Sequence, residues 1–313
     1  MVPNGSMLCY GAEIEPIGSI RRTATGGNDV TTSLDPLVTD PAEDLRPPAS
    51  TPALAIDSGG ETLLGLLHVP AGPGPHPIVI ILHGFPGNER NFDLAQAFRR
   101  AGYAALVFHY RGSWGVGGSW SWGHVLEDVG RVLAAVRDRS LVAAHRLDPD
   151  RLCLIGHSLG GFAALMSAAA DPSVVAVASV AGFDLSVVDT AGHADPAARE
   201  AYVDMFDGEL LPLRGTSGTA LVTEIEAAGR AWALTGLAAS LANRPVLLVG
   251  AGEDHIVTPV EVHHRPLVDA YLAHPENRLE HHVLPADHAL SGHRVQLARL
   301  LLSFLDRHLR PVR

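Results

Sequence analysis

The sequence predicts an α/β fold in which a mostly parallel central sheet is flanked by helices. Short apolar, strand-like runs alternate with segments whose apolar residues recur at helical spacing, and this order is typical of a parallel sheet with helical crossovers. The chain of 313 residues is long enough for one large domain with a sizeable core. With 47% hydrophobic and 18% charged residues, its composition is that of a globular enzyme.

The first 50 or so residues differ in texture from the rest. Residues 1–50 are rich in Gly, Pro, Thr and Asp with little periodicity, so we expect an N-terminal arm or leader outside the main core. The residues ahead of Met7 could be a vector-derived addition. The α/β domain is expected to cover residues 51–313 and to open with an antiparallel hairpin, residues 53–57 and 62–69.

Strands and helices then alternate. Strands are predicted from β-branched or apolar runs at residues 78–82, 104–109, 151–155, 174–180 and 245–250, and a last strand is predicted at residues 279–284, where the alternation of strands and helices resumes. Helices are predicted from apolar spacing at residues 92–100, 122–136, 162–170, 262–272 and 293–309. The rhythm stops between about 184 and 243, which predicts a small helical cap inserted into the domain.

Composition excludes several classes of function. The chain contains no lysine, so Schiff-base, pyridoxal-phosphate, Ser-Lys and Walker-A chemistry cannot operate. A formal net charge of −11 argues against a nucleic-acid partner, because nucleic acids bind to positive surfaces. The two cysteines, Cys9 and Cys153, form no metal-ligand pattern, and no apolar run is long enough to cross a bilayer. We therefore expect a soluble, cytoplasmic protein without metal, cofactor or membrane contact; a homo-oligomer remains compatible with the sequence.

The strongest chemical signal is Gly156-His157-Ser158-Leu159-Gly160, a G-x-S-x-G motif directly after a predicted strand and before a predicted helix. In that context Ser158 lies on a sharp, strained turn, where side chains at positions 156 and 160 would collide with the backbone. An ordinary glycine-rich turn between a strand and a helix is the alternative. We interpret Ser158 as a nucleophile.

This motif and the His83-Gly84-Phe85 run, together with acid and histidine candidates downstream, resemble the α/β-hydrolase superfamily over residues 53–309. Within it, the runs HGFPGN and YRGSWGVGGS are similar to small esterases and to the catalytic domains of prolyl-oligopeptidase-like enzymes. The resemblance implies an α/β-hydrolase fold and a Ser, Asp or Glu, His order of catalytic residues.

The base and the acid are chosen by position. His288 lies in the loop after the last predicted strand, whereas most other nearby histidines fall inside a strand or a helix. Asp254 follows the strand at 245–250 and is our choice for the acid, with Glu253 and Asp184 as alternatives. An acyl-transfer enzyme also needs two N–H groups aimed at the developing oxyanion, and the backbone N–H groups of Phe85 and Leu159 occupy the matching positions.

Three tryptophans, Trp114, Trp120 and Trp122, follow Arg111 in a glycine-rich loop. They could wall an acyl or alcohol pocket, or they could anchor the loop to the domain, with Arg111 paired to a helix carboxylate such as Asp128.

These signals together predict a serine hydrolase that cleaves carboxylic esters, or related acyl bonds, of small molecules through an acyl-enzyme. A prolyl-oligopeptidase-like peptidase and an acyltransferase or perhydrolase could use the same triad. A non-enzymatic binding protein is disfavoured because candidates for every member of the triad are present.

Overall fold

The computed structural model describes residues 35–310 of the chain. Most of the expected N-terminal arm, residues 1–34, lies outside the described residues. Residues 35–310 belong to one compact unit. Residues 35–50, which we had assigned to the arm, contact the domain: Arg100 Nε donates to the carbonyl oxygen of Pro36 at 2.5 Å.

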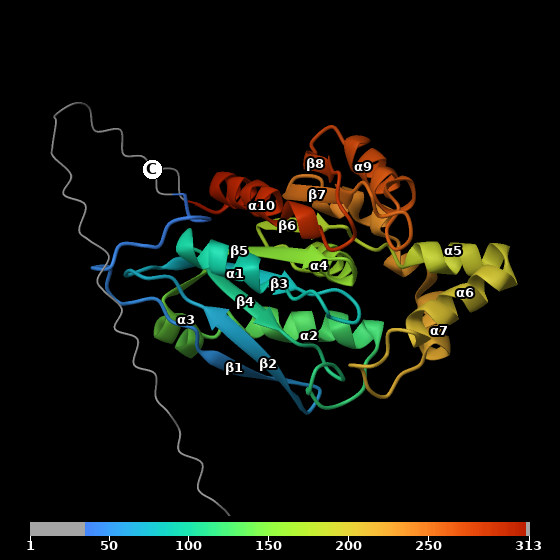
Figure 1. Cartoon of the computed structure of the whole chain (residues 1–313), viewed down its shortest axis with the longest axis horizontal. Helices are drawn as coiled ribbons and strands as arrows, with labels where there is room; N and C mark the ends of the chain where they lie inside the picture. Colours follow the sequence, from blue (N-terminus) through green and yellow to red (C-terminus); the bar gives the residue numbers. More distant parts are fainter. Residues whose placement is uncertain (1–34, 311–313) are drawn as a thin grey trace, which may run out of the picture. The chain divides into compact units, whose positions relative to one another are not determined.

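An eight-stranded sheet forms the centre of the domain, with the strand order β1-β2-β4-β3-β5-β6-β7-β8 (Figure 1). β1 pairs with β2, and β2 with β4, in antiparallel fashion, while every other pair is parallel. The prediction of an α/β fold with a mostly parallel sheet is therefore confirmed. The strands are β1 (Ala53–Ser58), β2 (Glu61–His68), β3 (His76–Leu82), β4 (Ala104–Phe108), β5 (Leu147–His157), β6 (Ala176–Val180), β7 (Pro245–Ala251) and β8 (Arg278–Leu284).

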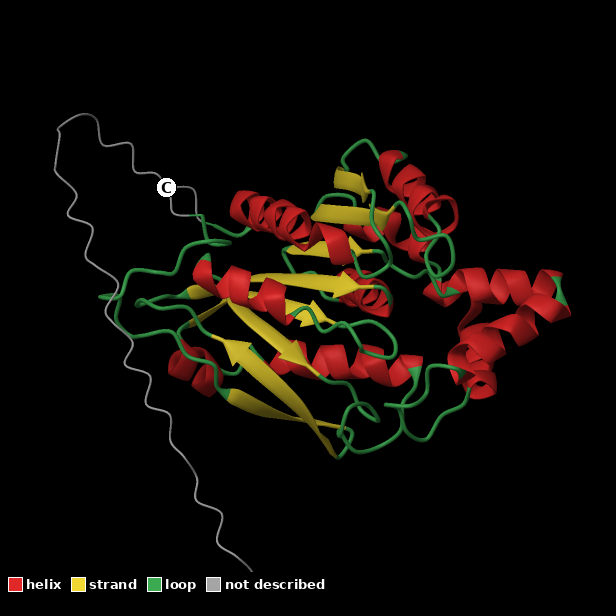
Figure 2. Ribbon diagram, viewed as in Figure 1, coloured by secondary structure: helices red, strands yellow, loops and turns green. Residues whose placement is uncertain are grey.

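The sheet is covered by helices on both faces, as Figure 2 shows. Side chains of β3 alternate between two apolar clusters: Val79 and Ile81 pack with α1 and α10, while Ile78 and Ile80 pack on the other face with α2, α4 and α9. Burial on both faces explains why these strands read as continuous apolar runs. The helices on the two faces are α1 (Phe92–Arg100), α2 (Trp122–Ala135), α3 (Arg139–His145), α4 (Leu159–Ala170), α9 (Arg265–Leu272) and α10 (Arg294–His308).

Two local details differ from the predictions. The seven-residue α3 (Arg139–His145) was not foreseen, because it buries no side chain completely and so leaves little apolar periodicity. The helix predicted at 262–272 begins instead with a π-helical turn, η3 (Val260–His264), before α9 continues it.

Between β6 and β7 the chain leaves the sheet and forms what we call the inserted segment, residues 184–243. Its three longer helices lie beyond the carboxyl ends of the parallel strands, at the right of Figure 1. The elements are α5 (Ser186–Ala194), α6 (Pro196–Asp207), α7 (Gly218–Ala228), η1 (Gly229–Trp232), η2 (Leu234–Leu237) and α8 (Ala238–Leu241).

The last two helical elements are η4 (Ser291–His293) and α10, which ends the described chain. Within residues 35–310, no helix combines the length and the apolar character that a bilayer crossing requires.

Candidate active site

Ser158 lies on the turn between β5 and α4, and its backbone is strained. Its φ of 56° and ψ of −122° fall in a region that residues with a side chain rarely adopt. The turn is possible only because glycines flank it: a Cβ on Gly156 would lie 1.8 Å from the carbonyl oxygen of Gly160. A Cβ on Gly160 would lie 2.0 Å from the carbonyl oxygen of Leu82 in β3. A side chain at position 156 or 160 would therefore collide with the backbone, as the motif predicted.

Asp254 and His288 come together from the loops after β7 and β8. His288 Nδ1 lies 2.7 Å from Asp254 Oδ2. The same carboxylate accepts hydrogen bonds from the backbone N–H groups of Val257, at 2.9 Å, and Thr258, at 2.8 Å, and from the Thr258 hydroxyl, at 2.6 Å. Because the carboxylate oxygen can only accept, the His288 proton is on Nδ1, which leaves the lone pair of Nε2 available.

The charge on Asp254 is held by these contacts. Burial alone would raise the pKa of the carboxyl group, but the hydrogen bonds from His288, Thr258 and Val257 outweigh it and lower the pKa well below its usual value. Asp254 is therefore ionised at neutral pH and can orient an imidazole and stabilise its protonated form.

The alternative acids do not contact His288. Glu253 is largely exposed, with 66% of its side chain accessible, and its Oε2 lies 3.9 Å from His255 Nε2. Asp184 Oδ1 accepts hydrogen bonds from the backbone N–H of Ser186, at 3.0 Å, and from its hydroxyl, at 2.8 Å, at the start of α5. Of the three carboxylates considered, only Asp254 is brought to the histidine.

Ser158 and His288 face the same cavity, which has a volume of about 280 Å³. No hydrogen bond joins their side chains in the described part of the chain, and such contacts often tighten only when substrate binds. The walls are mainly apolar and come from the main domain and from the inserted segment. The apolar lining residues include Trp122, Phe183, Leu185, Met205, Phe206 and Val257.

Phe85 and Leu159, the two expected oxyanion donors, both line this cavity. Neither backbone N–H donates to another backbone group in the described part of the chain, and Leu159 is the first residue of α4, where N–H groups have no partner within the helix. Gly84 allows the Phe85 loop to lie close to Ser158: a Cβ at Gly84 would lie 2.9 Å from Ser158 Cβ. Within residues 35–310 both N–H groups therefore lack a backbone acceptor, and both residues line the cavity beside Ser158.

His157 was not singled out by sequence reasoning. Its Nε2–H donates to the backbone carbonyl oxygen of His288 at 2.8 Å, and the two imidazole rings lie 4.9 Å apart. Burial lowers the pKa of His157 to about 3, so the ring is neutral. The only signal in the sequence was its place beside the nucleophile, where a bond to a loop 131 residues away cannot be foreseen.

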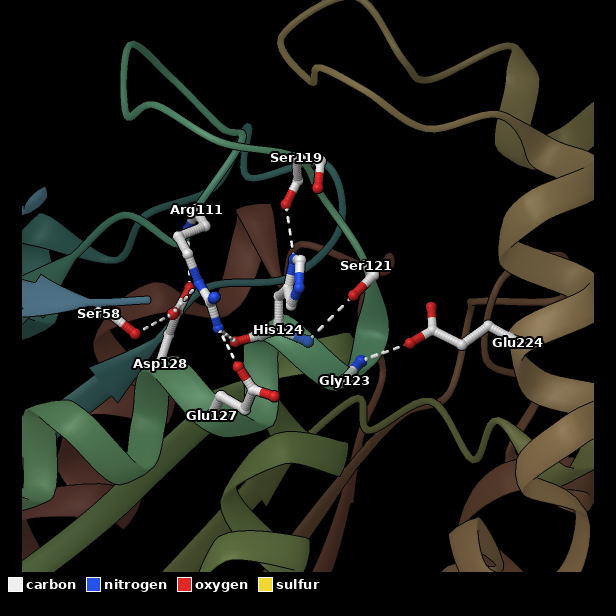
Figure 3. Close-up of polar contacts among 9 residues, drawn as sticks. All are labelled: Ser58, Arg111, Ser119, Ser121, Gly123, His124, Glu127, Asp128 and Glu224. Carbon is white, nitrogen blue, oxygen red and sulfur yellow. Dashed lines mark hydrogen bonds and ion pairs between the residues drawn. The ribbon is translucent and has the colours of Figure 1, made fainter. Parts of the chain in front are cut away.

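The glycine-rich loop, residues 110–121, is anchored by a buried polar network (Figure 3). Arg111 Nε contacts Asp128 at 2.7 Å, and Asp128 also accepts hydrogen bonds from Ser58 Oγ, at 2.6 Å, and from the backbone N–H of Arg111, at 2.7 Å. The expected pairing of Arg111 with a helix carboxylate is therefore confirmed. Trp122, just after the loop, lines the cavity; that it walls an acyl or alcohol group stays a prediction.

Glu224 of α7 joins the inserted segment to the start of α2, as Figure 3 shows. Its carboxylate accepts hydrogen bonds from the backbone N–H groups of Trp122, at 2.9 Å, and Gly123, at 2.8 Å. The Trp122 indole N–H also donates to the carbonyl oxygen of Leu221 at 3.0 Å. A carboxylate at a helix N-terminus is favourably placed, and here it fixes one wall of the cavity against the inserted segment.

Two aromatic residues of the inserted segment differ in position: Phe206 lines the cavity and Trp232 does not. Trp232 packs instead on Phe162 of α4, with the ring centres 5.8 Å apart.

Comparison with known proteins identifies the family. A model described as Alpha/beta hydrolase family matches residues 79–300. Among curated proteins, 2,6-dihydropseudooxynicotine hydrolase of Paenarthrobacter nicotinovorans is 33% identical over 166 residues, which are 52% of this chain and 43% of that protein. An uncharacterised 31.7 kDa protein of Escherichia coli is 30% identical over 149 residues, 44% of this chain and 49% of its own length. The chain thus spans less than half the length of these relatives.

Solved structures show the same fold at low identity. The esterase Est1E of Butyrivibrio proteoclasticus, with ferulic acid bound, has a TM-score of 0.64 and 20% identity, covering 82% of this chain and 99% of that one. An esterase of Pyrococcus furiosus has a TM-score of 0.61 and 15% identity, covering 84% and 92%. The expected α/β-hydrolase fold is confirmed.

Proposed function

The chain belongs to the alpha/beta hydrolase family, and we propose that it is a serine hydrolase that cleaves carboxylic esters of small molecules through an acyl-enzyme. The observation that carries the proposal is the contact of His288 with the ionised Asp254, beside a cavity that Ser158 also lines. That arrangement supplies a nucleophile, a base and an acid in the order of the superfamily.

The reaction follows from the positions of these groups. Ser158 Oγ attacks the acyl carbon while its proton passes to His288 Nε2, and the carbonyl oxygen becomes an oxyanion. The backbone N–H groups of Phe85 and Leu159 donate to that oxyanion. The imidazolium then returns the proton to the departing alcohol, and the acyl group stays on Ser158.

Deacylation repeats the sequence with water. His288 takes a proton from the attacking water, the second tetrahedral species collapses, and Ser158 Oγ leaves with that proton as the free acid departs. Asp254 does not take up the proton; it keeps Nδ1 protonated and stabilises the imidazolium. His157 supports the same geometry by holding the backbone of His288.

The inserted segment acts as a cap in this proposal. Leu185, Met205 and Phe206 close the cavity from that side, and they are apolar, so they favour apolar groups beside the scissile bond. The hydrogen bonds that Glu224 accepts from the backbone N–H groups of Trp122 and Gly123 attach the inserted segment to α2.

The proposal is tested by replacing Ser158 with alanine, with Ser167→Ala on the following helix as the matched control. Hydrolysis of a short nitrophenyl ester should fall by several orders of magnitude for S158A and change little for S167A. A fluorophosphonate probe should label the wild type and the control but not S158A. Near wild-type turnover by S158A would refute the mechanism.

A comparison of ester and anilide substrates distinguishes an esterase from a peptidase. An amide has a poorer leaving group and needs closer positioning of the transition state than an ester. We therefore expect kcat/KM for a nitrophenyl ester to exceed that for aminoacyl and prolyl anilides by far, and efficient anilide cleavage would assign the triad to a peptidase.

A further inference from the structure

A second cavity of about 490 Å³ adjoins the one that holds Ser158. Pro86, Asn88 and Glu209 line both cavities, so the two are neighbours. A short ester that reaches Ser158 would leave the second cavity empty. The combined space suits an extended molecule whose scissile bond lies at one end.

The second cavity is built by two loops that are joined to each other. The glycine-rich loop contributes Trp114, and residues 208–215 of the inserted segment form the facing wall. The backbone N–H of Trp114 donates to the carbonyl oxygen of Pro212 at 3.1 Å, and that of Arg214 donates to Gly112 at 2.9 Å. Since the glycine-rich loop is itself anchored by the network of Figure 3, the wall is a fixed part of the fold.

Trp114 is held in an unusual conformation at this wall. Its φ of 49° is rare for a residue with a bulky side chain. The indole N–H donates to the carbonyl oxygen of Pro86 at 2.8 Å, and the Arg90 guanidinium lies 4.4 Å from the ring centre. Such strain persists only where surrounding contacts enforce it, and it is concentrated at ligand sites.

The lining defines the chemistry of the ligand. Apart from Asn88, its polar side chains are one carboxylate, Glu209, and one guanidinium, Arg214, so the lining carries no net charge. Leu211, with 99% of its surface accessible, presents an apolar side chain that nothing else in residues 35–310 covers. The remaining surface comes from Trp114, prolines, Leu213 and glycines.

We propose that the second cavity binds the remote part of an extended ester, and that this part is uncharged, flat and apolar. The proposal rests on the proposed function, because it places the scissile bond of the same molecule at Ser158. A flat apolar group lies against Trp114 and Leu211 and removes both from water.

The test fills the second cavity without touching the first. Gly208 lines only the second cavity, and a Cβ there would meet only the carbonyl oxygens of Asp204 and Met205, at 3.4 and 3.6 Å. Gly208→Leu therefore introduces bulk without backbone strain. Gly236→Leu is the matched control, because Gly236 belongs to the inserted segment, lines neither cavity, and has no atom within 4 Å of an added Cβ.

The assay compares a short nitrophenyl acetate with esters extended by a phenylalkyl chain on the acyl or the alcohol side. For the wild type, kcat/KM of the better extended ester should exceed that of the acetate by about tenfold. Gly208→Leu should remove most of that ratio and Gly236→Leu should keep it. For the wild type, kcat/KM should fall when the remote ring carries a carboxylate, and it should also fall when the ring carries a trimethylammonium group.

Leu211→Ala gives a second measure that does not depend on packing, since this side chain is exposed, and it should lower the ratio partially. The proposal is overturned if extension brings no gain, if Gly208→Leu and Gly236→Leu behave alike, or if a charged remote ring is preferred.

Binding separates this proposal from the proposed function. Calorimetry with the amide analogue of the extended ester measures binding without turnover. The Kd of this analogue should be about tenfold higher for Gly208→Leu than for the wild type. If neither ester is hydrolysed but this difference in Kd is found, the proposed function fails and the second cavity stands. If esters are hydrolysed but the amide binds both proteins equally, the second cavity fails and the proposed function stands.

Discussion

Two buried histidines, His83 and His157, should make the protein lose stability in mild acid. His83 and His157 are both buried, and burial lowers the pKa of each ring to about 3. Each donates one ring N–H to a carbonyl oxygen at 2.8 Å, His83 to Gly84 and His157 to His288. The second ring nitrogen of each makes no hydrogen bond in the described part of the chain. A second proton on either ring would therefore be a buried charge without an acceptor.

The direction and size of this loss of stability follow from the linkage between proton binding and folding. These rings are neutral in the folded state down to about pH 3, whereas in the unfolded chain they take up a proton near pH 6.5. The unfolded state therefore binds more protons between these values, and stability falls as the pH falls through that range. From pH 7 to pH 5 the loss is about 2 kcal/mol per histidine, or about 4 kcal/mol for the two. Burial acts in the same direction on other rings, lowering the pKa to about 4 for His109, His263 and His264.

The measurement is urea unfolding at pH 7 and pH 5 for the wild type and for His157→Gln, in which glutamine keeps an N–H donor but cannot titrate. The free energy of unfolding should drop by at least about 4 kcal/mol for the wild type, and by about 2 kcal/mol less for the variant. His193→Gln is the control: hydrogen bonding to the backbone of Asp189 and the charge of Asp189 raise the pKa of this exposed ring, so its removal cannot reduce the loss. Equal unfolding free energies of the wild type at the two pH values would refute the reasoning.

Three further predictions concern single positions. Asp254→Asn should lower kcat on a short ester by about 10³- to 10⁴-fold, because an amide favours the wrong tautomer of His288. Asp184→Asn should mainly lower the melting temperature. If Asp184→Asn lowered kcat more than Asp254→Asn in steady-state kinetics, Asp184 would be the acid. Glu224→Ala should cost about 1–2 kcal/mol of unfolding free energy and raise KM for bulky esters more than for acetates, and an unchanged KM ratio would contradict its role in the wall. Gly156→Ala should destabilise the fold by more than about 4 kcal/mol in urea unfolding, whereas Gly130→Ala, where an added Cβ meets nothing, should be neutral or stabilising.

The features that local sequence signals could predict are those set by neighbouring residues. The turn that carries Ser158 is one: its two glycines, the apolar strand before it and the helix after it all lie within a short stretch. The inner strands β3, β4, β6 and β7 could be predicted for the same reason, since burial on both faces leaves apolar runs. His288 could be chosen because chain order restricts the base to the loop after the last strand.

The features that sequence could not settle depend on contacts between distant segments. Asp254 and Asp184 both follow strands, and only the three-dimensional arrangement shows that one contacts His288 while the other accepts hydrogen bonds from Ser186 at the start of α5. The bond from His157 to His288 and the attachment of Glu224 to α2 likewise join residues about 100 or more positions apart. Neither pair leaves a periodic or composition signal along the chain.

The same distinction explains why the reaction can be inferred further than the substrate. The parallel strands β3, β5, β7 and β8 end at one edge of the sheet, so groups that follow them converge without any contribution from the inserted segment. The walls around the scissile bond instead combine the loop after β3, the start of α2 and the ends of helices in residues 184–243. A substitution in any of these segments can change which ester fits while the reacting groups stay where the strands place them. Substrate preference is therefore expected to change readily with mutations at the inserted segment and the glycine-rich loop, whereas mutations at the strand ends should abolish the reaction for every substrate.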